Sequence, residues 1–177
     1  MLVFEAALDD ISLLRESIST ISELIDEAEL HVGSEGIEII AADRAVVAVI
    51  NFSLSKNAFK EYKCDQEQKI GINLMNFLQV LRRAQSGETL KIKLDGNKLT
   101  LTLEGESKRR FTLPLIDVSK EETPEISKLE AGFSSTFTVD SEILNSGIED
   151  AELITDSVIF TIRKDMLNMM AESDSSS

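Results

Sequence analysis

Two nearly identical hexapeptides, far apart in the chain, constrain its fold more than any other sequence feature. The first, IDEAEL, spans residues 25–30, and the second, IEDAEL, spans residues 148–153. A helix-like pattern precedes each hexapeptide, and strand-like runs follow it. Self-similarity at a domain-sized spacing predicts that one unit was duplicated. The second copy then begins near Phe133 and is shorter than the first, because the sequence ends at Ser177.

Composition indicates a soluble globular protein, because 42% of the residues are hydrophobic and 28% are charged. Eighteen basic residues against 32 acidic ones give a net charge of −14, which argues against a surface that is basic throughout but permits a small basic face. Cys64 is the only cysteine, so no intrachain disulfide can form. No apolar run approaches a membrane span and no signal peptide is recognisable. We expect an intracellular protein, cytoplasmic or, in a eukaryotic cell, nuclear.

The spacing of apolar residues predicts two amphipathic helices in the first unit. One begins after a cap at Asp9 or Asp10, and the other spans 74–84 after a cap at Asn73. The apolar face of the first helix consists of Ile11, Leu14, Ile18, Ile21 and Ile25. Strands are predicted at 3–7, 28–32, 37–41, 46–52, 59–63 and 69–72.

Alternating residues predict three further strands, at 90–94, 99–103 and 110–115, the first two joined by a turn at Asp95-Gly96. Pro114 indicates that the third strand lies at a sheet edge or ends at this residue. Residues 117–132 lack periodicity and indicate a linker. Beyond it we expect a strand at 135–139, a helix at 141–149 and strands at 158–162 and 166–170. The predicted fold is α+β, with antiparallel sheets, both helices on one face and an incomplete second copy.

Catalysis has little support in the sequence. His31 is the only histidine, and no metal-ligand spacing surrounds it. The glycines of GSEG at 33–36 occupy a turn rather than a phosphate-binding loop. Paired acids are numerous but are inevitable among 32 acidic residues. We therefore expect no enzyme, no cofactor and no metal.

The polar faces of the two helices allow two interpretations. Arg15, Arg82 and Arg83 are the basic residues of these helices, and Ser, Asn and Gln lie around them. A solvated helix face has this composition. A surface that touches the DNA backbone without reading bases has it as well.

Seven segments together carry a resemblance to a known family. They are FEAALDD at 4–10, LIDEAELHVGSEGIEIIAAD at 24–43, AVVAVINF at 45–52, FKEYKC at 59–64, KIGINLMNFLQVLRRA at 69–84, FTLPLID at 111–117 and VDSEILNSGIEDAELITDSVIF at 139–160. The chain resembles a sliding clamp of the proliferating cell nuclear antigen (PCNA) type in its archaeal form. This resemblance implies a duplicated DNA-clamp fold, with a first clamp domain at 1–117, an interdomain connector at 118–132 and a partial second clamp domain at 133–177.

The resemblance also implies DNA-facing positions on the helices. Arg15, Gln79 and Arg82 match such positions, and Arg83 is a further basic residue on the second helix. Glu16 and Ser22 stand where other clamps often have lysine. The helix at 141–149 has no basic residue, so the surface facing DNA is less basic than is usual for the family.

Two further sites follow from the resemblance. The predicted partner-peptide pocket consists of Ala42 and Val46 below the connector and of Thr123, Pro124 and Ile126 on it. The predicted protomer interface is the strand that contains Lys108, Arg109, Arg110, Phe111, Thr112 and Leu113. In the family this strand pairs with a neighbour's second domain, in a part of the clamp that would follow residue 177.

The implied function is that of a DNA polymerase processivity factor in DNA replication and repair, which forms a homotrimeric ring if the second domain is complete. Its expected partners are double-stranded DNA, bound topologically, a clamp loader, and a DNA polymerase and other enzymes that bind through short peptide motifs. The alternative is a fragment or interaction domain of the clamp fold that binds partner peptides but does not encircle DNA.

Overall fold

The computed structural model describes residues 4–43, 45, 47–118 and 132–173. The chain divides into two compact units, Met1–Ile126 and Ser127–Ser177, and each is described by itself. Most of the predicted connector, residues 119–131, lies outside these ranges.

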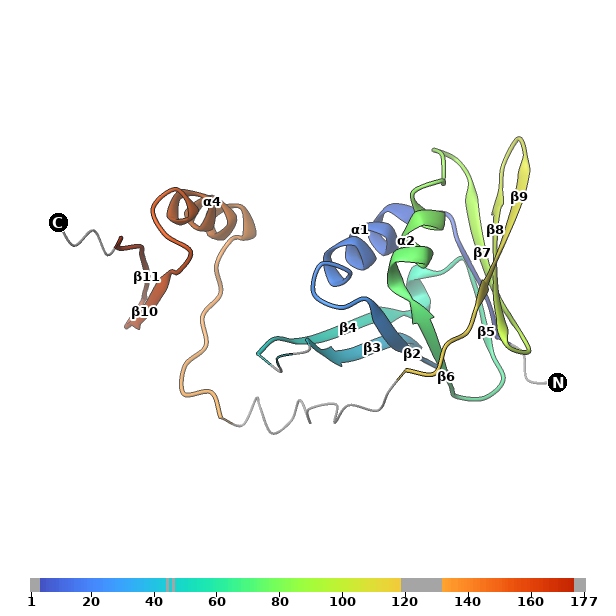
Figure 1. Ribbon diagram of the computed structural model, residues 1–177, viewed down its shortest axis with the longest axis horizontal. Coiled ribbons are helices and arrows are strands. Elements are labelled where there is room, and N and C mark those ends of the chain that lie inside the picture. Colours follow the sequence, from blue (N-terminus) through green and yellow to red (C-terminus); the bar gives the residue numbers. More distant parts are fainter. Residues whose placement is uncertain (1–3, 44, 46, 119–131, 174–177) are drawn as a thin grey trace. The chain divides into compact units, whose positions relative to one another are not determined.

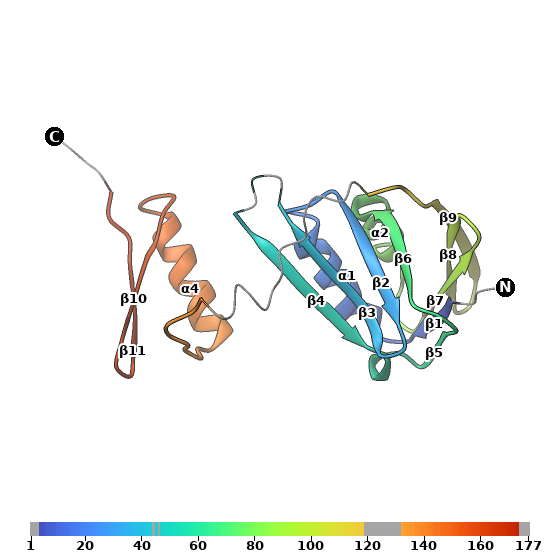
Figure 2. The same ribbon diagram turned by 90° about the horizontal axis from the view of Figure 1, so that it is seen from below.

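The first unit contains two antiparallel sheets. The five-stranded sheet has the order β5-β1-β7-β8-β9 and comprises β1 (Phe4–Leu8), β5 (Glu61–Cys64), β7 (Thr89–Asp95), β8 (Lys98–Glu104) and β9 (Lys108–Pro114). The four-stranded sheet has the order β4-β3-β2-β6 and comprises β2 (Glu27–Gly33), β3 (Gly36–Ala42), β4 (Val49–Ser55) and β6 (Gln68–Asn73). Figure 2 shows the four strands of the second sheet side by side, with both helices behind them.

The helices α1 (Ile11–Ile21) and α2 (Leu74–Leu81) lie next to each other on the same face of the four-stranded sheet (Figure 1). Their caps are as predicted: the Asp10 side chain accepts a hydrogen bond from the Ser12 amide, and Asn73 accepts one from the Asn76 amide. A short 3-10 helix, η1 (Lys56–Ala58), was not predicted. The prediction that both helices share one side is confirmed.

Both helices end earlier than their patterns predict. The α1 helix stops at Ile21, and Ile25 is buried from the turn that follows it. The α2 helix stops at Leu81 instead of Ala84. Apolar spacing predicts which residues are buried, but it does not fix where a helix ends. A buried residue in the turn after a helix continues the same apolar pattern.

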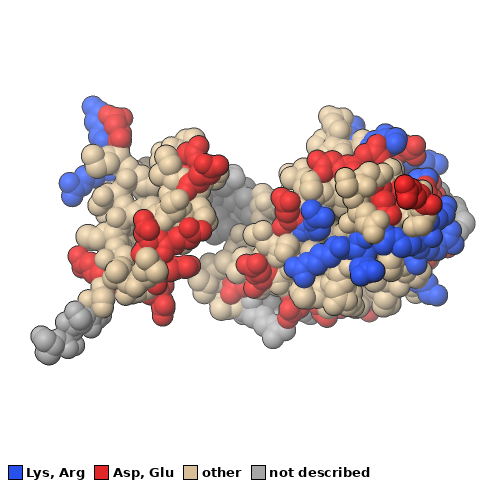
Figure 3. All heavy atoms as spheres, turned by 90° about the horizontal axis from the view of Figure 1, so that it is seen from above, with Lys and Arg blue, Asp and Glu red and all other residues tan. Residues whose placement is uncertain are grey.

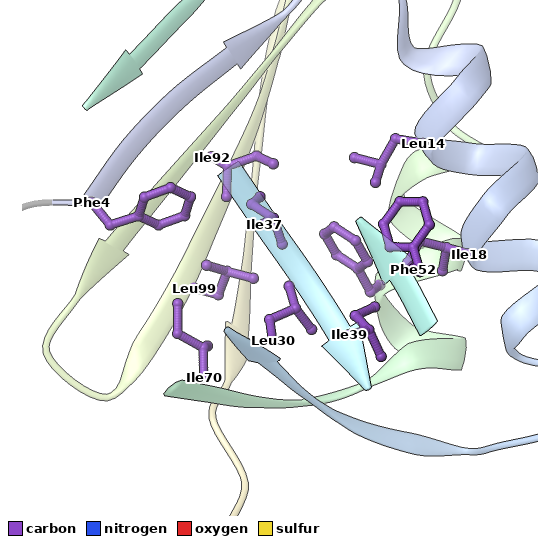
Figure 4. Close-up of a pocket in the computed structure, with 11 residues that line it drawn as sticks. Phe4, Leu14, Ile18, Leu30, Ile37, Ile39, Phe52, Ile70, Ile92 and Leu99 are labelled. Atoms are coloured by element: carbon purple, nitrogen blue, oxygen red, sulfur yellow. The ribbon is translucent and has the colours of Figure 1, made fainter. Parts of the chain in front are cut away.

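One apolar core joins both helices to both sheets. Its most deeply buried members include Ile18 of α1, Phe77 of α2, Ile39 of the four-stranded sheet and Leu101 of the five-stranded sheet. Figure 4 shows a gap within this core, lined by apolar side chains from the helices and both sheets. The gap has a volume of about 10 Å³, no more than one water molecule needs. It is a packing defect and not a ligand site.

The edge strand β9 and the residues after it close this unit. β9 pairs only with β8 among the described residues, so the edge position predicted from Pro114 is confirmed. Beyond β9, the Ile116 amide donates to the Gly71 carbonyl of β6 at 3.0 Å. A Cβ atom at position 71 would lie 2.0 Å from the Ile116 oxygen. Only glycine permits this close contact.

The second unit contains α4 (Ser141–Glu152) and a hairpin of β10 (Ile159–Arg163) and β11 (Met166–Met170). The helix extends to Glu152, beyond the predicted end at residue 149. The strand predicted at 135–139 is wrong: this segment has no regular structure. Its alternating residues are mostly exposed and have no strand to pair with in the described part of the chain.

The two hexapeptides do not occupy equivalent places. Residues 25–30 form the turn after α1 and the start of β2, whereas most of 148–153 lies inside α4. The equivalent positions are instead the helix caps Asp10 and Asp140, and the hairpin pairs Gly33–Gly36 and Arg163–Met166. The order helix, strand, strand therefore recurs in both units. The two copies align through these positions and not through the hexapeptides.

Leu14 and Leu13 provide a matched test of this core, because they are neighbours in α1 with side chains 3% and 53% exposed. Leu14→Ala should lower the free energy of unfolding by about 2–5 kcal/mol, since it leaves a cavity in a packed core. Leu13→Ala should cost less than about 1 kcal/mol. Denaturant unfolding of both variants checks this, and equal losses would contradict the assignment of the buried face.

Candidate functional site

The helix pair brings the predicted DNA-facing residues of the two helices together. The Arg82 Nη2 atom donates to the Ser19 Oγ atom of α1 at 3.3 Å. Arg15 lies one turn before Ser19 and therefore on the same stripe of α1. The Arg15 side chain is 36% exposed, and its Nη2 atom lies 4.0 Å from the Glu16 carboxylate. Arg15 and Arg82 thus belong to one surface that faces away from the core.

The end of α2 supplies the rest of this surface. Gln79, Arg82 and Arg83 are all exposed, and Arg82 is the C-cap residue. Positive side chains at the end of a helix are stabilised by its dipole. Figure 3, which looks onto the side of the first unit that carries the helices, shows Lys and Arg side chains in a band, with acidic side chains beside it.

Two neighbouring positions limit the positive charge of the surface. Glu16 is exposed and carries the opposite charge. The Ser22 hydroxyl donates to the Ser19 carbonyl at 2.8 Å and so caps the end of α1. In the second unit, α4 contains Glu142, Glu149, Asp150 and Glu152 and no basic residue.

Strand β9, the predicted protomer interface, has an outer and an inner face. Lys108, Arg110 and Thr112 are exposed, while Arg109, Phe111 and Leu113 are half-buried. The backbone edge of β9 that does not face β8 has no partner strand among the described residues. Such an edge is a template for adding another strand.

Arg109 is already engaged within its own unit. Its Nη2 atom donates to both carboxylate oxygens of Glu88, at 2.7 and 2.5 Å, and its Nη1 atom donates to the Arg83 carbonyl at 3.1 Å. The Gln85 amide also donates to Glu88, and together with Arg109 it holds the pKa of Glu88 below its ordinary value. Sequence reasoning missed Glu88, because nothing in its local pattern distinguishes it from the other 31 acidic residues.

The predicted partner-peptide pocket is only partly described. Ala42 is half-buried at the end of β3. Val46, Thr123, Pro124 and Ile126 lie outside the described residues.

The turn after Ala42 is built around Asp43, which sequence reasoning also missed. The Asp43 carboxylate accepts hydrogen bonds from the amides of Ala48, Val47 and Ala45, at 2.8, 2.7 and 3.2 Å. These bonds hold the pKa of Asp43 below its ordinary value, with the Ala48 amide contributing most. The turn explains why β4 starts at Val49 and not at the predicted residue 46.

Other candidate chemistry is not supported by the geometry. His31 lies 2.9 Å from the Glu29 carboxylate, which also binds Lys69. The described residues include no group of three or more His, Cys, Asp or Glu side chains that could hold a metal ion. Across the same ranges, no helix has the length and apolar character needed to cross a membrane.

The sequence of this chain is similar to those of DNA polymerase sliding clamps. A DNA polymerase sliding clamp of Thermococcus gammatolerans is 37% identical over 172 residues, which cover 97% of this chain and 68% of the relative. The clamp of Methanothermobacter thermautotrophicus is 30% identical, with 97% and 69% covered. The chain is thus homologous to DNA polymerase sliding clamps.

The family follows from the domain match and from solved structures. The N-terminal domain of proliferating cell nuclear antigen matches residues 3–122, and the chain belongs to that family. A crystal structure of PCNA from Thermococcus kodakaraensis superimposes with a TM-score of 0.80 at 29% identity, covering 98% of this chain and 70% of that one. A PCNA2–PCNA3 complex from Sulfolobus tokodaii gives 0.80 at 25% identity, covering 97% and 70%.

Family membership confirms two predictions. The α+β clamp fold with antiparallel sheets is the fold of this chain. Sliding clamps are not enzymes, so the expectation of a non-enzymatic protein is also confirmed. The roles of individual residues stay predictions.

Glu104 of β8 provides a test of the ion pairs that connect β8 to Lys108 at the start of β9 and to Lys91 of β7. Its carboxylate lies 2.5 Å from the Lys108 ammonium and 2.6 Å from that of Lys91, and these contacts lower the pKa of Glu104 from 4.5 to about 2. A carboxyl group with a lowered folded-state pKa stabilises the fold above its unfolded value, and this contribution is lost as pH falls through the folded value.

Glu104→Gln should therefore be less stable than the wild type at pH 7, and the difference should shrink between pH 4.5 and about 2. Denaturant unfolding over this range measures it. Glu106→Gln, at an exposed position in the next turn, is the control. A difference that does not change with pH would contradict the ionic origin of the effect.

Proposed function

We propose that this chain acts as a protomer of a DNA sliding clamp, a processivity factor that encircles duplex DNA and tethers replication and repair enzymes. The observation that carries the proposal is the α1–α2 pair. It buries one apolar stripe in the core and leaves Arg15, Arg82 and Arg83 on the opposite surface, linked across the helices by Arg82 and Ser19.

The small number of basic residues suits sliding. Contacts between basic side chains and phosphates are independent of sequence and weaken with salt. A ring retains DNA by topology, so its inner surface needs only weak contacts that break and reform as the ring moves. Arg15, Arg82 and Arg83, with the uncharged Gln79, meet this requirement on an otherwise acidic protein with a net charge of −14.

Ring closure in this proposal uses the open edge of β9. A head-to-tail interface places one surface of a protomer against a different surface of the next, and it closes into a ring where the rotation permits. Residues Lys108 to Leu113 supply the pairing strand on one side. A homotrimer, as in the sequence-based prediction, remains part of the proposal.

The proposed docking site for partner peptides is the connector together with the surface around Ala42. Insertion of apolar side chains beside a strand-like backbone pairing is a common mode of peptide recognition. DNA polymerase, other replication and repair enzymes and a clamp loader are the proposed partners, and the cytoplasm is the proposed location.

One observation favours a second function. Helix α4 carries four acidic residues and no basic one, so it offers no attraction to phosphate. A protein that kept the fold and the peptide site but does not encircle DNA would show this pattern. Binding of a partner peptide without any retention of circular DNA would support this alternative.

The DNA-facing assignment predicts a change in salt dependence. Arg15→Gln with Arg82→Gln should reduce the slope of log affinity against log salt by about 2, because about two phosphate contacts are lost. The control is Lys63→Gln with Lys98→Gln, which removes the same charge from strands of the five-stranded sheet. Equal slopes for the two double variants would contradict the assignment.

If this chain forms a ring by itself, the β9 edge must pair with another copy of the chain, and assembly must then depend on concentration. Light scattering should give a mass that rises above the 19.6 kDa of one chain as concentration increases. Those amides of residues 108–113 that point away from β8 should exchange with solvent more slowly over the same range, because an added strand would pair with them. A mass of one chain at every concentration, with unchanged exchange, would exclude ring formation by this chain alone.

A further inference from the structure

Glu88 is the one buried charged side chain among the described residues, at 7% exposure. It lies in the segment between α2 and β7, next to the half-buried Thr89 where β7 begins. A buried carboxylate is costly unless charged or polar partners surround it. The partners of the Glu88 carboxylate therefore indicate which parts of the chain it holds in place.

Three residues from elsewhere in the chain surround the Glu88 side chain: Gln85, Arg109 and Gly105. Gln85, just after α2, donates its amide to the Glu88 Oε2 atom at 2.8 Å. Arg109 of β9 donates to both oxygens, at 2.7 and 2.5 Å. Gly105, in the turn between β8 and β9, leaves room for the side chain, since a Cβ atom there would lie 2.9 Å from the Glu88 Cγ atom.

Arg109 extends the connection to the basic end of α2. Its Nη1 atom donates to the carbonyl of Arg83 at 3.1 Å, while its Nη2 atom is held by Glu88. Its Nε atom is buried without a hydrogen-bond partner in the structure. The orientation of the guanidinium group is therefore set by Glu88 and by the Arg83 carbonyl.

An exposed ion pair would contribute little to such an arrangement, because water screens both charges. This pair is different. The Glu88 side chain is 7% exposed and that of Arg109 is 26% exposed. Removing one member of a buried pair leaves the other charge without compensation, which disrupts the local structure strongly.

We propose that Glu88 is a positioning residue. Its carboxylate holds Arg109, and through it the edge strand β9, in a fixed relation to the end of α2 that carries Arg82 and Arg83. The edge that pairs with another protomer and the helix end that faces DNA then depend on one ion pair. The contacts stand by themselves, while their consequence for assembly rests on the proposed function.

The test compares Glu88→Gln with Glu106→Gln. Both variants lose one negative charge in the same region, but Glu106 is exposed in the turn before β9. Hydrogen exchange is measured on folded protein, checked by circular dichroism. Amides of residues 82–88 and 108–113 should exchange at least about tenfold faster in Glu88→Gln, as expected when a buried pair loses one partner. Glu106→Gln should match the wild type.

A second variant keeps the test decisive if Glu88→Gln does not fold. Arg109→Lys retains the positive charge but presents a single ammonium group, which cannot reproduce the planar arrangement of donors to Glu88 and Arg83. Exchange of residues 82–88 should again rise. Unchanged exchange in both segments for whichever variant folds would overturn the proposal.

Light scattering separates this proposal from the proposed function. If the wild type assembles, Glu88→Gln should need at least about tenfold more protein to reach the same mass, in line with the tenfold loss of edge protection. Assembly equal to that of Glu106→Gln would overturn the positioning role. If the wild type does not assemble at any concentration, ring formation fails, and the exchange measurement still decides whether Glu88 ties β9 to α2.

Discussion

The structure of the first unit depends on burying two apolar helix stripes in one core that both sheets share. Neither sheet could form this core alone, because each strand offers side chains to it only at alternate positions. Ile18 and Phe77 supply the apolar volume from the helices, and Ile39 and Leu101 supply it from the two sheets. This shared burial fixes the rotation of α1 and α2 about their own axes.

The candidate surfaces follow from that rotation. Once Leu14 and Ile18 face the core, Arg15 and Ser19 must face elsewhere, because they lie on a different stripe of the same helix. The contact from Arg82 to Ser19 joins the polar stripes of the two helices. The position of the strand edge depends on topology instead. Strand β9 is the last strand of the five-stranded sheet, so its basic residues lie at the edge of that sheet.

The sequence predicts those features that depend on periodicity. The buried stripes of both helices, the caps Asp10 and Asn73 and the hairpin of β7 and β8 arise from local patterns, and the structure has them. The strand predicted at 135–139 fails because alternation shows only that a strand could form, whereas a strand also needs a neighbour. The register that the hexapeptides predict is wrong, because two nearly identical sequences form a turn and strand in one context and mostly a helix in the other.

The two residues that organise the candidate sites were beyond sequence reasoning for a different reason. Glu88 and Asp43 act through partners that the fold brings to them: Arg109 for Glu88, and the backbone amides of a turn for Asp43. Neither a charge count nor a spacing rule distinguishes them from other acids. Recognising the family did not identify them either, because it supplied positions on the helices, the connector and the edge strand.

Gly71 has a mechanical consequence. Because a side chain there would collide with Ile116, glycine lets the chain that leaves β9 lie against β6 and bond to it. The chain after β9 is therefore held against β6 by the hydrogen bond between Ile116 and Gly71. A partner proposed to bind beyond this point would therefore be attached beside β6 and not at the end of β9.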